Sequence, residues 1–142
     1  MLSFMKATDV RKEWSSIVDA TVRVKPQFFK RTRDHMFLSD VHFMEELLSA
    51  YSYSAVQMEE EDGSITLALN EMDLVANGKD ENEARLALAS DILEYAEDFY
   101  NDFSYWSSAP NRKEHIPYVF KALFVGDVKK IGESIQCQAG KI

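Results

Sequence analysis

Cysteine, glycine, proline and long apolar runs are all scarce in this sequence. Its 142 residues include one cysteine, three prolines and five glycines. Because Cys137 is the only cysteine, an internal disulfide and a cysteine-based zinc site are both excluded. No apolar run approaches the roughly 18 to 20 residues of a membrane-spanning helix, and the opening MLSFMKATDVRK has no signal-peptide hydrophobic region. We therefore expect a cytoplasmic protein that does not use a membrane.

Motifs of catalysis and cofactor binding are missing as well. The three histidines, His35, His42 and His115, lack the spacing of metal ligands or of a catalytic triad, so we expect them at the surface or half-buried. The sequence contains no glycine-rich phosphate loop, nucleophile elbow or zinc-protease motif. With 46% hydrophobic residues the chain can still bury a core, in which we expect Trp14 and Trp106. These features predict a folded protein that is not an enzyme and holds no cofactor or metal.

Charge is divided unevenly along the chain, whose net charge is −8. Residues 1–44 hold eight Lys or Arg against five acids, a net charge of +3. Residues 45–142 hold eight cations against nineteen acids, a net charge of −11. An anionic partner would be attracted to the first third of the chain and repelled by the rest.

The start of the chain predicts a short strand and a helix. Residues 2–5 indicate the strand, and Thr8 can cap a helix over residues 9–22. Apolar side chains recur in this helix at intervals that predict one buried stripe: Val10, Trp14, Ile17, Val18 and Thr21. Arg11 and Lys12 fall off this stripe in the first turn, where the helix dipole makes cations mildly unfavourable. Either water solvates them or an anion compensates them.

A hairpin and a second helix follow. The stretches QFFKRT and HMFLS are short apolar runs separated by Arg33 and Asp34, a pattern that predicts two paired strands. Asp40 can cap a helix over residues 41–51. The apolar residues of this helix share one side, which we expect to be buried: Phe43, Met44, Leu47, Leu48 and Tyr51. The predicted order is strand, helix, hairpin, helix.

The sequences FMKATDVRKEW, KPQFFKRTR and MFLSDVHFMEEL, in this order, resemble the N-terminal module of Phd/YefM-type antitoxins over about residues 2–50. In that family the module dimerises and presents cations of the first helix and the hairpin to operator DNA. The resemblance implies a homodimer and nominates five DNA-binding residues: Arg11, Lys12, Lys30, Arg31 and Arg33. The sequence departs from the family at the hairpin turn, which lacks a glycine, and at Asp34, which adds a negative charge beside the cations.

These five cations have two explanations. Lys and Arg bind DNA by neutralising phosphates, and a dimer would supply ten cations, comparable to the roughly 6 to 10 phosphate contacts of proteins with steep salt dependence. Lys and Arg on an edge strand also discourage aggregation. The cations could therefore bind DNA or merely keep the hairpin soluble.

The middle of the chain predicts a second hairpin and a long helix. Asp62-Gly63 is a strong turn signal. Apolar residues around it alternate with polar ones: Val56, Met58, Ile65, Leu67 and Leu69. Asp80 and Glu83 have capping-box spacing at the start of the helix. The expected buried stripe of the helix is Leu88, Ile92, Leu93, Ala96, Phe99, Tyr100 and Phe103. This order is similar to that of HicB-like antitoxin domains, a likeness that concerns topology alone.

Acidic residues gather in two places in this region. One is the run over residues 59–62, and the other is the outer side of the long helix, at Glu94, Glu97, Asp98 and Asp102. Such charges ordinarily form a solvated surface. They would also attract a basic protein, and toxins that handle RNA are typically basic, so complementary charge would speed and orient their capture.

The C-terminal part predicts two short helices. Asn111 and Glu114 have capping-box spacing, Pro117 suits a helix start, and Gly126-Asp127 interrupt the chain before the last helix. The composition is not that of a disordered tail. Any toxin would therefore meet a largely prefolded surface.

The sequence thus predicts an α+β protein, in which a Phd/YefM-like strand-helix-hairpin-helix module precedes a β-hairpin, a long helix and short C-terminal helices. Residues 1–52 are expected to dimerise and bind DNA, and residues 53–142 to form an acidic toxin-binding region. The predicted function is that of a type II antitoxin, which neutralises a basic toxin by direct binding and represses its own operon. The alternative is a protein-interaction module of this fold that no longer binds DNA.

Overall fold

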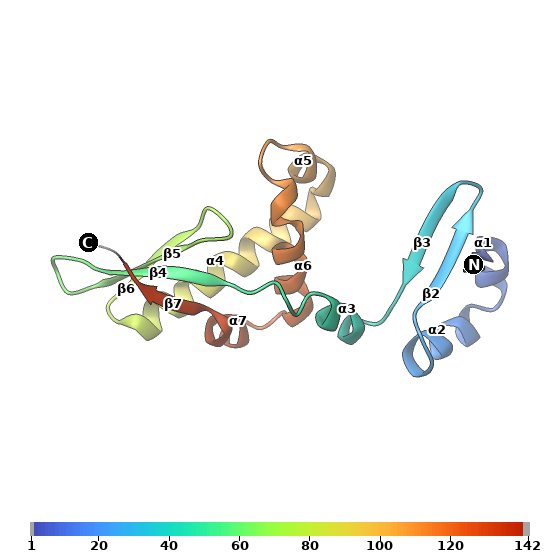
Figure 1. Ribbon diagram of the computed structural model, residues 1–142, viewed down its shortest axis with the longest axis horizontal. Coiled ribbons are helices and arrows are strands. Elements are labelled where there is room, and N and C mark those ends of the chain that lie inside the picture. The colour runs from blue at the N-terminus through green and yellow to red at the C-terminus, as the bar shows by residue number, and fades with distance from the viewer. Residues whose placement is uncertain (1, 141–142) are drawn as a thin grey trace. The chain divides into compact units, whose positions relative to one another are not determined.

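The computed structural model describes residues 2–140, and the chain divides into two compact units. Unit 1 is Met1–Leu47 and unit 2 is Leu48–Ile142. Each unit has its own β-sheet, with three strands in unit 1 and four in unit 2 (Figure 1). The predicted α+β class is therefore confirmed. Within residues 2–140, every helix is too short or too polar to cross a membrane.

Unit 1 has the predicted strand, hairpin and final helix, but two helices stand where one was predicted. Its strands are β1 (Met5–Lys6), β2 (Gln27–Arg31) and β3 (Asp34–Leu38). β1 runs parallel to β2, and β2 and β3 form the antiparallel hairpin. Its helices are α1 (Ala7–Lys12), α2 (Trp14–Arg23) and α3 (Val41–Leu47). The Asp40 carboxylate accepts a hydrogen bond from the backbone N–H of Phe43 at 2.8 Å, so the predicted cap of α3 is confirmed.

The single helix predicted over residues 9–22 is in fact two helices. α1 begins before Thr8, which therefore does not cap it, and the chain turns at Glu13 (φ −112°, ψ 32°) before α2. Arg11 and Lys12 consequently lie in the last turn of α1 and not in a first turn. The negative end of a helix dipole favours cations there, so the expected unfavourable placement was wrong.

Few side chains of unit 1 are buried. Those below a tenth exposed are Val10, Ile17 and Thr21. Trp14 is 52% exposed and Val18 is 38% exposed, although both were predicted to be buried. α3 ends at Leu47, short of residue 51, and buries none of its side chains. A chain segment this short has too few residues to cover both faces of a sheet, which leaves much of its apolar surface open.

The sheet of unit 2 contains two strands that the sequence did not indicate. Its strands are β4 (Ser54–Glu59), β5 (Ile65–Leu69), β6 (Val75–Gly78) and β7 (Gln136–Ala139). They are arranged in the order β6-β5-β4-β7. The β4–β5 hairpin was predicted, and Gly63 supplies its positive φ of 85°. The unpredicted strands are β6, which pairs with β5, and β7, which pairs in parallel with β4.

Two helices of unit 2 begin at a side-chain cap, and the cap of α4 (Glu81–Asn101) was predicted. The helices that follow α4 are α5 (Phe103–Ser108), the 3-10 helix η1 (Lys113–His115), α6 (Ile116–Val125) and α7 (Val128–Ser134). Asp80 accepts a hydrogen bond from the backbone N–H of Glu83 at 2.8 Å, and Asp127 caps α7 in the same way. Asn111 caps no helix, contrary to expectation, because η1 begins later and lacks a side-chain cap.

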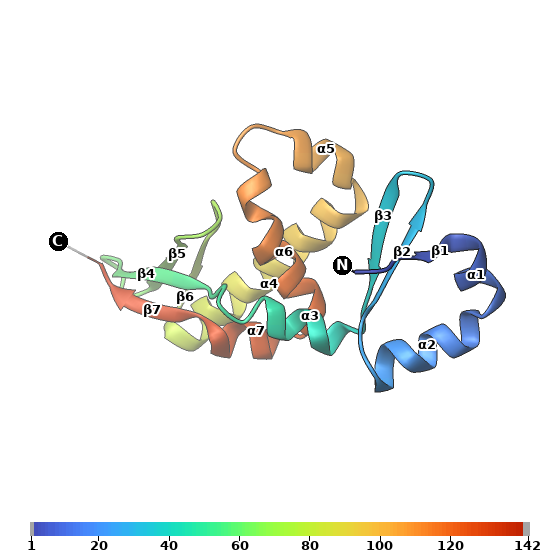
Figure 2. The same ribbon diagram turned by 45° about the vertical axis from the view of Figure 1, so that its right-hand side comes forward.

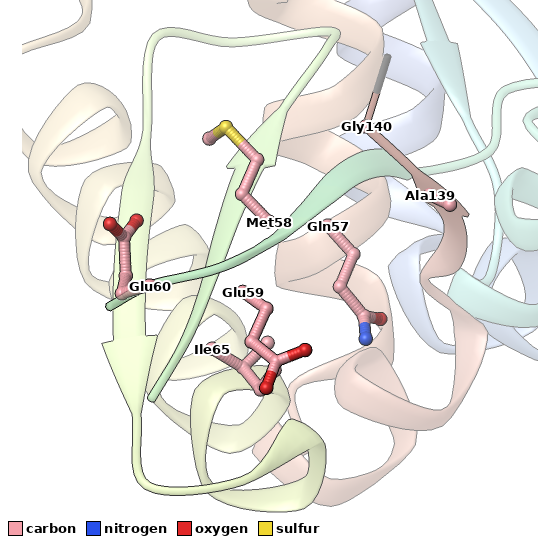
Figure 3. Close-up of a pocket in the computed structure, with 7 residues that line it drawn as sticks. All are labelled: Gln57, Met58, Glu59, Glu60, Ile65, Ala139 and Gly140. Atoms are coloured by element: carbon pink, nitrogen blue, oxygen red, sulfur yellow. The ribbon is translucent and has the colours of Figure 1, made fainter. Parts of the chain in front are cut away.

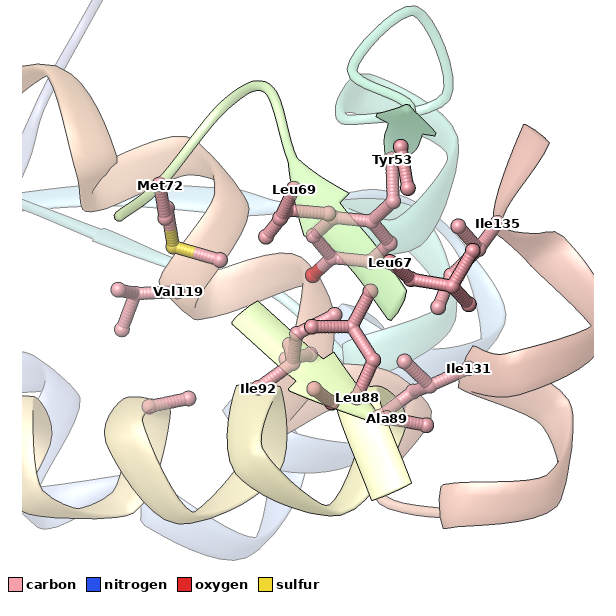
Figure 4. Close-up of a cluster of buried hydrophobic side chains, with 14 of the residues drawn as sticks. Tyr53, Leu67, Leu69, Met72, Leu88, Ala89, Ile92, Val119, Ile131 and Ile135 are labelled. Carbon is pink, nitrogen blue, oxygen red and sulfur yellow. The ribbon is translucent and has the colours of Figure 1, made fainter. Parts of the chain in front are cut away.

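The core of unit 2 lies between its sheet and the helices α4, α6 and α7 (Figure 4). Its largest fully buried side chains are Tyr53, Leu67, Met72, Leu88, Ile92, Phe99, Val119 and Ile131. The sequence predicted that Val56 and Met58 form the buried face of β4, and this was wrong. Ala55 on the opposite face is buried, while Met58 is 42% exposed. The predicted stripe of the long helix was also too wide, because Tyr100 is 57% exposed and Phe103 belongs to α5.

Candidate functional site

All five nominated cations are exposed on unit 1, but they do not share one flat surface. Lys30 and Arg31 are consecutive on β2, so their side chains project from opposite faces of the sheet. Arg33 lies in the hairpin turn, while Arg11 and Lys12 end α1. The hairpin cations therefore surround the end of the hairpin.

The hairpin turn differs from the prediction by one residue. Arg31 pairs with Asp34, so the turn consists of Thr32 and Arg33, not of Arg33 and Asp34. Thr32 has φ 55°, a conformation that suits glycine and is unusual for a β-branched residue. The turn glycine that the sequence lacks is therefore replaced by a strained threonine.

Asp34 forms an ion pair with one of the nominated cations. A guanidinium nitrogen of Arg31 lies 3.5 Å from an Asp34 carboxylate oxygen, and both side chains are mostly exposed. Within residues 2–140, no carboxylate oxygen lies within 4.0 Å of the charged groups of the other four cations. An exposed ion pair is weak, so Arg31 can exchange Asp34 for another anion at little cost.

The structure adds a cation that the sequence reading missed. Lys6 on β1 lies directly beside Lys30 in the parallel pairing of β1 and β2. Lys6 also lines a shallow hollow with Lys12, in which Asp9 and Glu13 partly offset the positive charge. Lys6 thereby links the helix cations to the hairpin cations. Only the β1–β2 register places Lys6 beside Lys30. A parallel strand of two residues has no local sequence pattern from which it could be predicted.

Many acidic residues of unit 2 have local structural roles. Asp62 accepts hydrogen bonds from the backbone N–H and the hydroxyl of Ser64, which lower the pKa of its carboxyl group. Glu81 pairs with Arg85 at 2.8 Å. Other carboxylates cap helices, pair with cations or hold a backbone N–H: Glu71, Asp73, Asp80, Glu83 and Asp127.

Seven of the other exposed acids of unit 2 form the two groups that the sequence indicated, and Glu114 and Glu133 lie apart from them in the sequence. One is Glu59, Glu60 and Glu61 at the end of the β4–β5 hairpin. The other lies on α4 and just after it: Glu94, Glu97, Asp98 and Asp102. None of these seven carboxylates lies within 4.0 Å of a basic group in the described part of the chain. Both groups are therefore available to a basic partner.

An open hollow of about 590 Å³ lies beside the first acidic group. It is lined by residues of β4, Ile65 of β5 and the end of β7 (Figure 3). Figure 3 shows the Glu59 and Gln57 side chains extending in the same direction from β4. The hollow contains carboxylates but no nucleophile or histidine. Its chemistry suits the contact of a basic side chain better than a reaction.

His115 is more buried than expected and belongs to an aromatic cluster in unit 2. It is 6% exposed, and its Nδ1 atom lies 2.7 Å from the Tyr95 hydroxyl. Burial lowers the pKa of His115, and the nearby positive charge of Arg112 acts in the same direction. The rings of Phe99 and Trp106 pack against Tyr95. Among the described residues, no group of three or more His, Cys, Asp or Glu side chains is arranged to hold a metal ion.

Known proteins similar to this chain are antitoxins. A family model described as "PHD_like: Antitoxin of toxin-antitoxin, RelE / RelB, TA system" matches residues 1–137. Comparison with curated proteins gives no match. Among solved structures, the chain is similar to the antitoxin part of a proposed toxin/antitoxin system from Syntrophomonas wolfei subsp. wolfei, determined by crystallography at 1.80 Å resolution. The two chains are 34% identical with a TM-score of 0.91, and the similarity covers 98% of this chain and 100% of the other. Since the family model spans both units, this chain belongs to the PHD-like family of antitoxins of RelE/RelB-type toxin–antitoxin systems.

Proposed function

We propose that this antitoxin neutralises a basic toxin by direct binding and represses its own operon as a homodimer on operator DNA. In this proposal, unit 1 is a Phd/YefM-type DNA-binding module, unit 2 binds the toxin, and the protein acts in the cytoplasm. The observation that carries the proposal is the separation of unpaired charge. Among the described residues, exposed cations without an acidic neighbour outnumber exposed carboxylates without a basic neighbour on unit 1, and the reverse holds on unit 2.

The apolar surface of unit 1 supports the homodimer. Trp14, Val18 and Val22 follow one another at four-residue intervals on α2, and they are 52%, 38% and 55% exposed. Phe28 and Phe37 pair across the hairpin with ring centroids 4.9 Å apart, yet they remain 37% and 41% exposed. Domains this small usually need a partner, a metal or disulfides to bury enough apolar area. A second copy of unit 1 would bury this surface.

The homodimer is tested by substituting Val18→Lys, which places a charge in the middle of the exposed α2 surface. Light scattering after size-exclusion chromatography should report a dimer for the wild type and a monomer for the variant. The matched control is Val24→Lys, because Val24 is 74% exposed and lies beyond the end of α2. A wild-type protein that is monomeric at micromolar concentration would contradict the proposal.

DNA binding is tested by a gel shift with DNA from upstream of the protein's own gene. Arg31→Ala combined with Arg33→Ala removes up to four phosphate contacts per dimer. The slope of log affinity against log salt should therefore become shallower by up to about 3.6, at about 0.9 per phosphate. The control is Arg23→Ala combined with Lys25→Ala, which removes the same charge from exposed positions outside the nominated set.

Retardation that vanishes in the Arg31 and Arg33 variant but persists in the control would support DNA binding. The absence of any shift by the wild type at low salt would exclude it.

The Arg31–Asp34 ion pair favours a second candidate function, a protein-interaction module that no longer binds DNA. Asp34→Asn removes the competing carboxylate and separates the two candidates. If unit 1 binds DNA, this variant should bind the same DNA more tightly than the wild type does. If neither the wild type nor Asp34→Asn binds DNA while toxin neutralisation persists, the second candidate is correct.

The proposal predicts that a small basic toxin is encoded next to this gene, and toxin neutralisation is tested with that protein. Its expression alone should stop growth, and coexpression of this chain should restore growth and yield a complex that copurifies. Growth arrest that persists during coexpression would contradict the proposed antitoxin mechanism.

A further inference from the structure

Four aromatic side chains form a continuous surface on unit 2, which we call the aromatic ridge: Tyr100, Phe103, Phe120 and Phe124. The Phe120 ring lies 6.2 Å from that of Tyr100, 6.1 Å from that of Phe103 and 5.9 Å from that of Phe124. Figures 1 and 2 show α5 following the end of α4, and α6 running beside α4. The ridge therefore joins α4, α5 and α6.

Two rings of the aromatic ridge are exposed, whereas Phe120 is half-buried against the core of unit 2 and Phe124 is also half-buried. Phe99, next to Tyr100 in the sequence, is fully buried, whereas Tyr100 is 57% exposed and Phe103 is 39% exposed. Contiguous exposed apolar surface on a folded protein usually marks an interaction site. Aromatic residues are also enriched in the central positions of protein interfaces, where they supply much of the binding energy.

A groove of about 260 Å³ lies on α4 beside the ridge, and we call it the acidic groove. Its charged residues are Glu94, Glu97 and Asp98, and Val128 of α7 closes its other side. Glu97 precedes Tyr100 by three residues on α4, so the two side chains are neighbours on the helix surface. The ridge and the groove thus form one surface, partly apolar and partly anionic.

We propose that the aromatic ridge and the acidic groove together bind the cognate toxin, through basic side chains that surround an apolar patch on the toxin. This inference rests on the proposed function, because it names the surface that unit 2 uses for neutralisation. The unpaired carboxylates select a basic partner. They also disfavour a second copy of this chain, since a self-complementary contact would bring six of these carboxylates together.

The other acidic group fits this role less well. Glu59, Glu60 and Glu61 lie at the end of a hairpin, where Met58 is the exposed apolar neighbour and no aromatic ring accompanies them. Charge at an interface mainly speeds and orients association, whereas buried aromatic anchors slow dissociation. The hairpin end can therefore attract a basic protein, while the ridge can hold it.

The experiment measures binding of the full-length chain to the small basic protein that the proposed function predicts to be encoded next to its gene, by biolayer interferometry at several salt concentrations. The first variant, Tyr100→Ser with Phe103→Ser, should weaken binding by at least about 30-fold, as expected for interface anchors. The second variant neutralises the groove with Glu94→Gln, Glu97→Gln and Asp98→Asn. It should slow association and flatten its salt dependence.

Two matched controls test whether the effects are specific to this surface. Glu59→Gln, Glu60→Gln and Glu61→Gln together remove the same charge from the hairpin end. Tyr105→Ser removes a ring that is 61% exposed on α5 but lies outside the ridge. Both controls should bind within about threefold of the wild type, because surface substitutions away from a binding site have small effects. Thermal unfolding should show that all the variants are folded.

The outcomes separate this inference from the proposed function. If the wild type fails to bind the basic protein, the proposed function fails. If the wild type binds it and the ridge variant binds equally well, the proposed function stands and this inference is wrong. The inference is also wrong if the ridge variant becomes monomeric while it still binds the basic protein, because the ridge would then be a contact between copies of this chain.

Discussion

Unit 2 buries a core of sixteen side chains between its sheet and its helices, whereas unit 1 buries three side chains in the described residues. Both units combine a small sheet with helices, so the difference arises from the amount of chain available to cover the sheet. Unit 2 covers one face of its sheet with several helices that pack on one another. Unit 1 leaves Trp14, Val18 and Phe37 partly open to solvent.

This difference implies that the two units are stabilised in different ways. Unit 2 can be stable as a single copy, because the apolar side chains of its core are buried within one chain. The stability of unit 1 should depend on protein concentration, because a second copy contributes part of its apolar burial. Each unit contains one tryptophan, Trp14 in unit 1 and Trp106 in unit 2, so fluorescence can follow the two units separately.

The largest effect is expected from a matched pair of core substitutions. Ile92→Ala in unit 2 should lower the free energy of unfolding by about 2 to 5 kcal/mol, because Ile92 is fully buried. Ile17→Ala should cost less, because the surroundings of Ile17 are more open and can relax. Urea unfolding of Trp14→Phe and Trp106→Phe backgrounds measures each unit alone. Equal losses of unfolding free energy in the two units would contradict the proposed difference in how they are stabilised.

A smaller effect is expected where β6 meets α4. A Cβ atom at Gly78 would lie 2.3 Å from the backbone nitrogen of Ala84, a distance that forces the backbone to shift. Gly78→Ala should therefore cost about 1 to 3 kcal/mol of unit 2 stability. Gly132→Ala is the control, because a Cβ there would meet its neighbours at 3.6 Å or more. The control should be neutral or stabilising, since alanine is favoured over glycine within helices.

The two hairpin turns each contain a residue with positive φ, so opposite substitutions there should have opposite effects on stability. Gly63 in unit 2 has φ 85°, and a Cβ atom at this position would meet no other atom within 4 Å. Gly63→Ala should therefore cost about 1 to 2 kcal/mol through backbone strain alone. Thr32 in unit 1 has φ 55°, and Thr32→Gly should stabilise unit 1 by up to about 1 kcal/mol. Thermal unfolding of each unit measures both changes. A destabilising Thr32→Gly would show that the hairpin of unit 1 is not strained.

The smallest effect is a pH dependence confined to unit 2. Burial holds the pKa of His115 below its ordinary value of 6.5, so the unfolded chain takes up the proton first as the pH falls. Unit 2 should therefore lose stability below about pH 6.5, by at most about 1.4 kcal/mol per pH unit. His115→Gln should flatten this slope in unfolding experiments between pH 5 and 7, a range of about two units around the histidine pKa. An unchanged slope would assign the pH dependence to other groups.

Local signals in the sequence predicted the helix starts and turns that depend on neighbouring residues. Asp80 caps α4, Asp40 caps α3 and Gly63 forms its turn, because each interaction spans only a few residues. Gly126, with φ 63°, ends α6 for the same reason. Asn111 has equivalent spacing but caps no helix, since the chain around it packs as a 3-10 turn.

Features that depend on distant residues could not be predicted. β7 has the sequence QCQA, without a β-branched or aromatic residue, and it is a strand only because β4 pairs with it. The pattern of β4 misled because the small side chain of Ala55 faces the core and is fully buried, while the larger Val56 and Met58 lie on the other face. Lys6 reached the cationic surface through strand register alone. The roles of the five nominated cations stay predictions.

The pairing of β7 with β4 has a consequence for biosynthesis. Residues 54–59 leave the ribosome early, yet they acquire their second neighbouring strand only after residues 136–139 have been made. Unit 1 needs no later segment to complete its sheet, so it can fold while translation continues. A chain that stops before β7 would carry a finished N-terminal hairpin and an open β4 edge, whose unpaired backbone groups could pair with a strand of another chain.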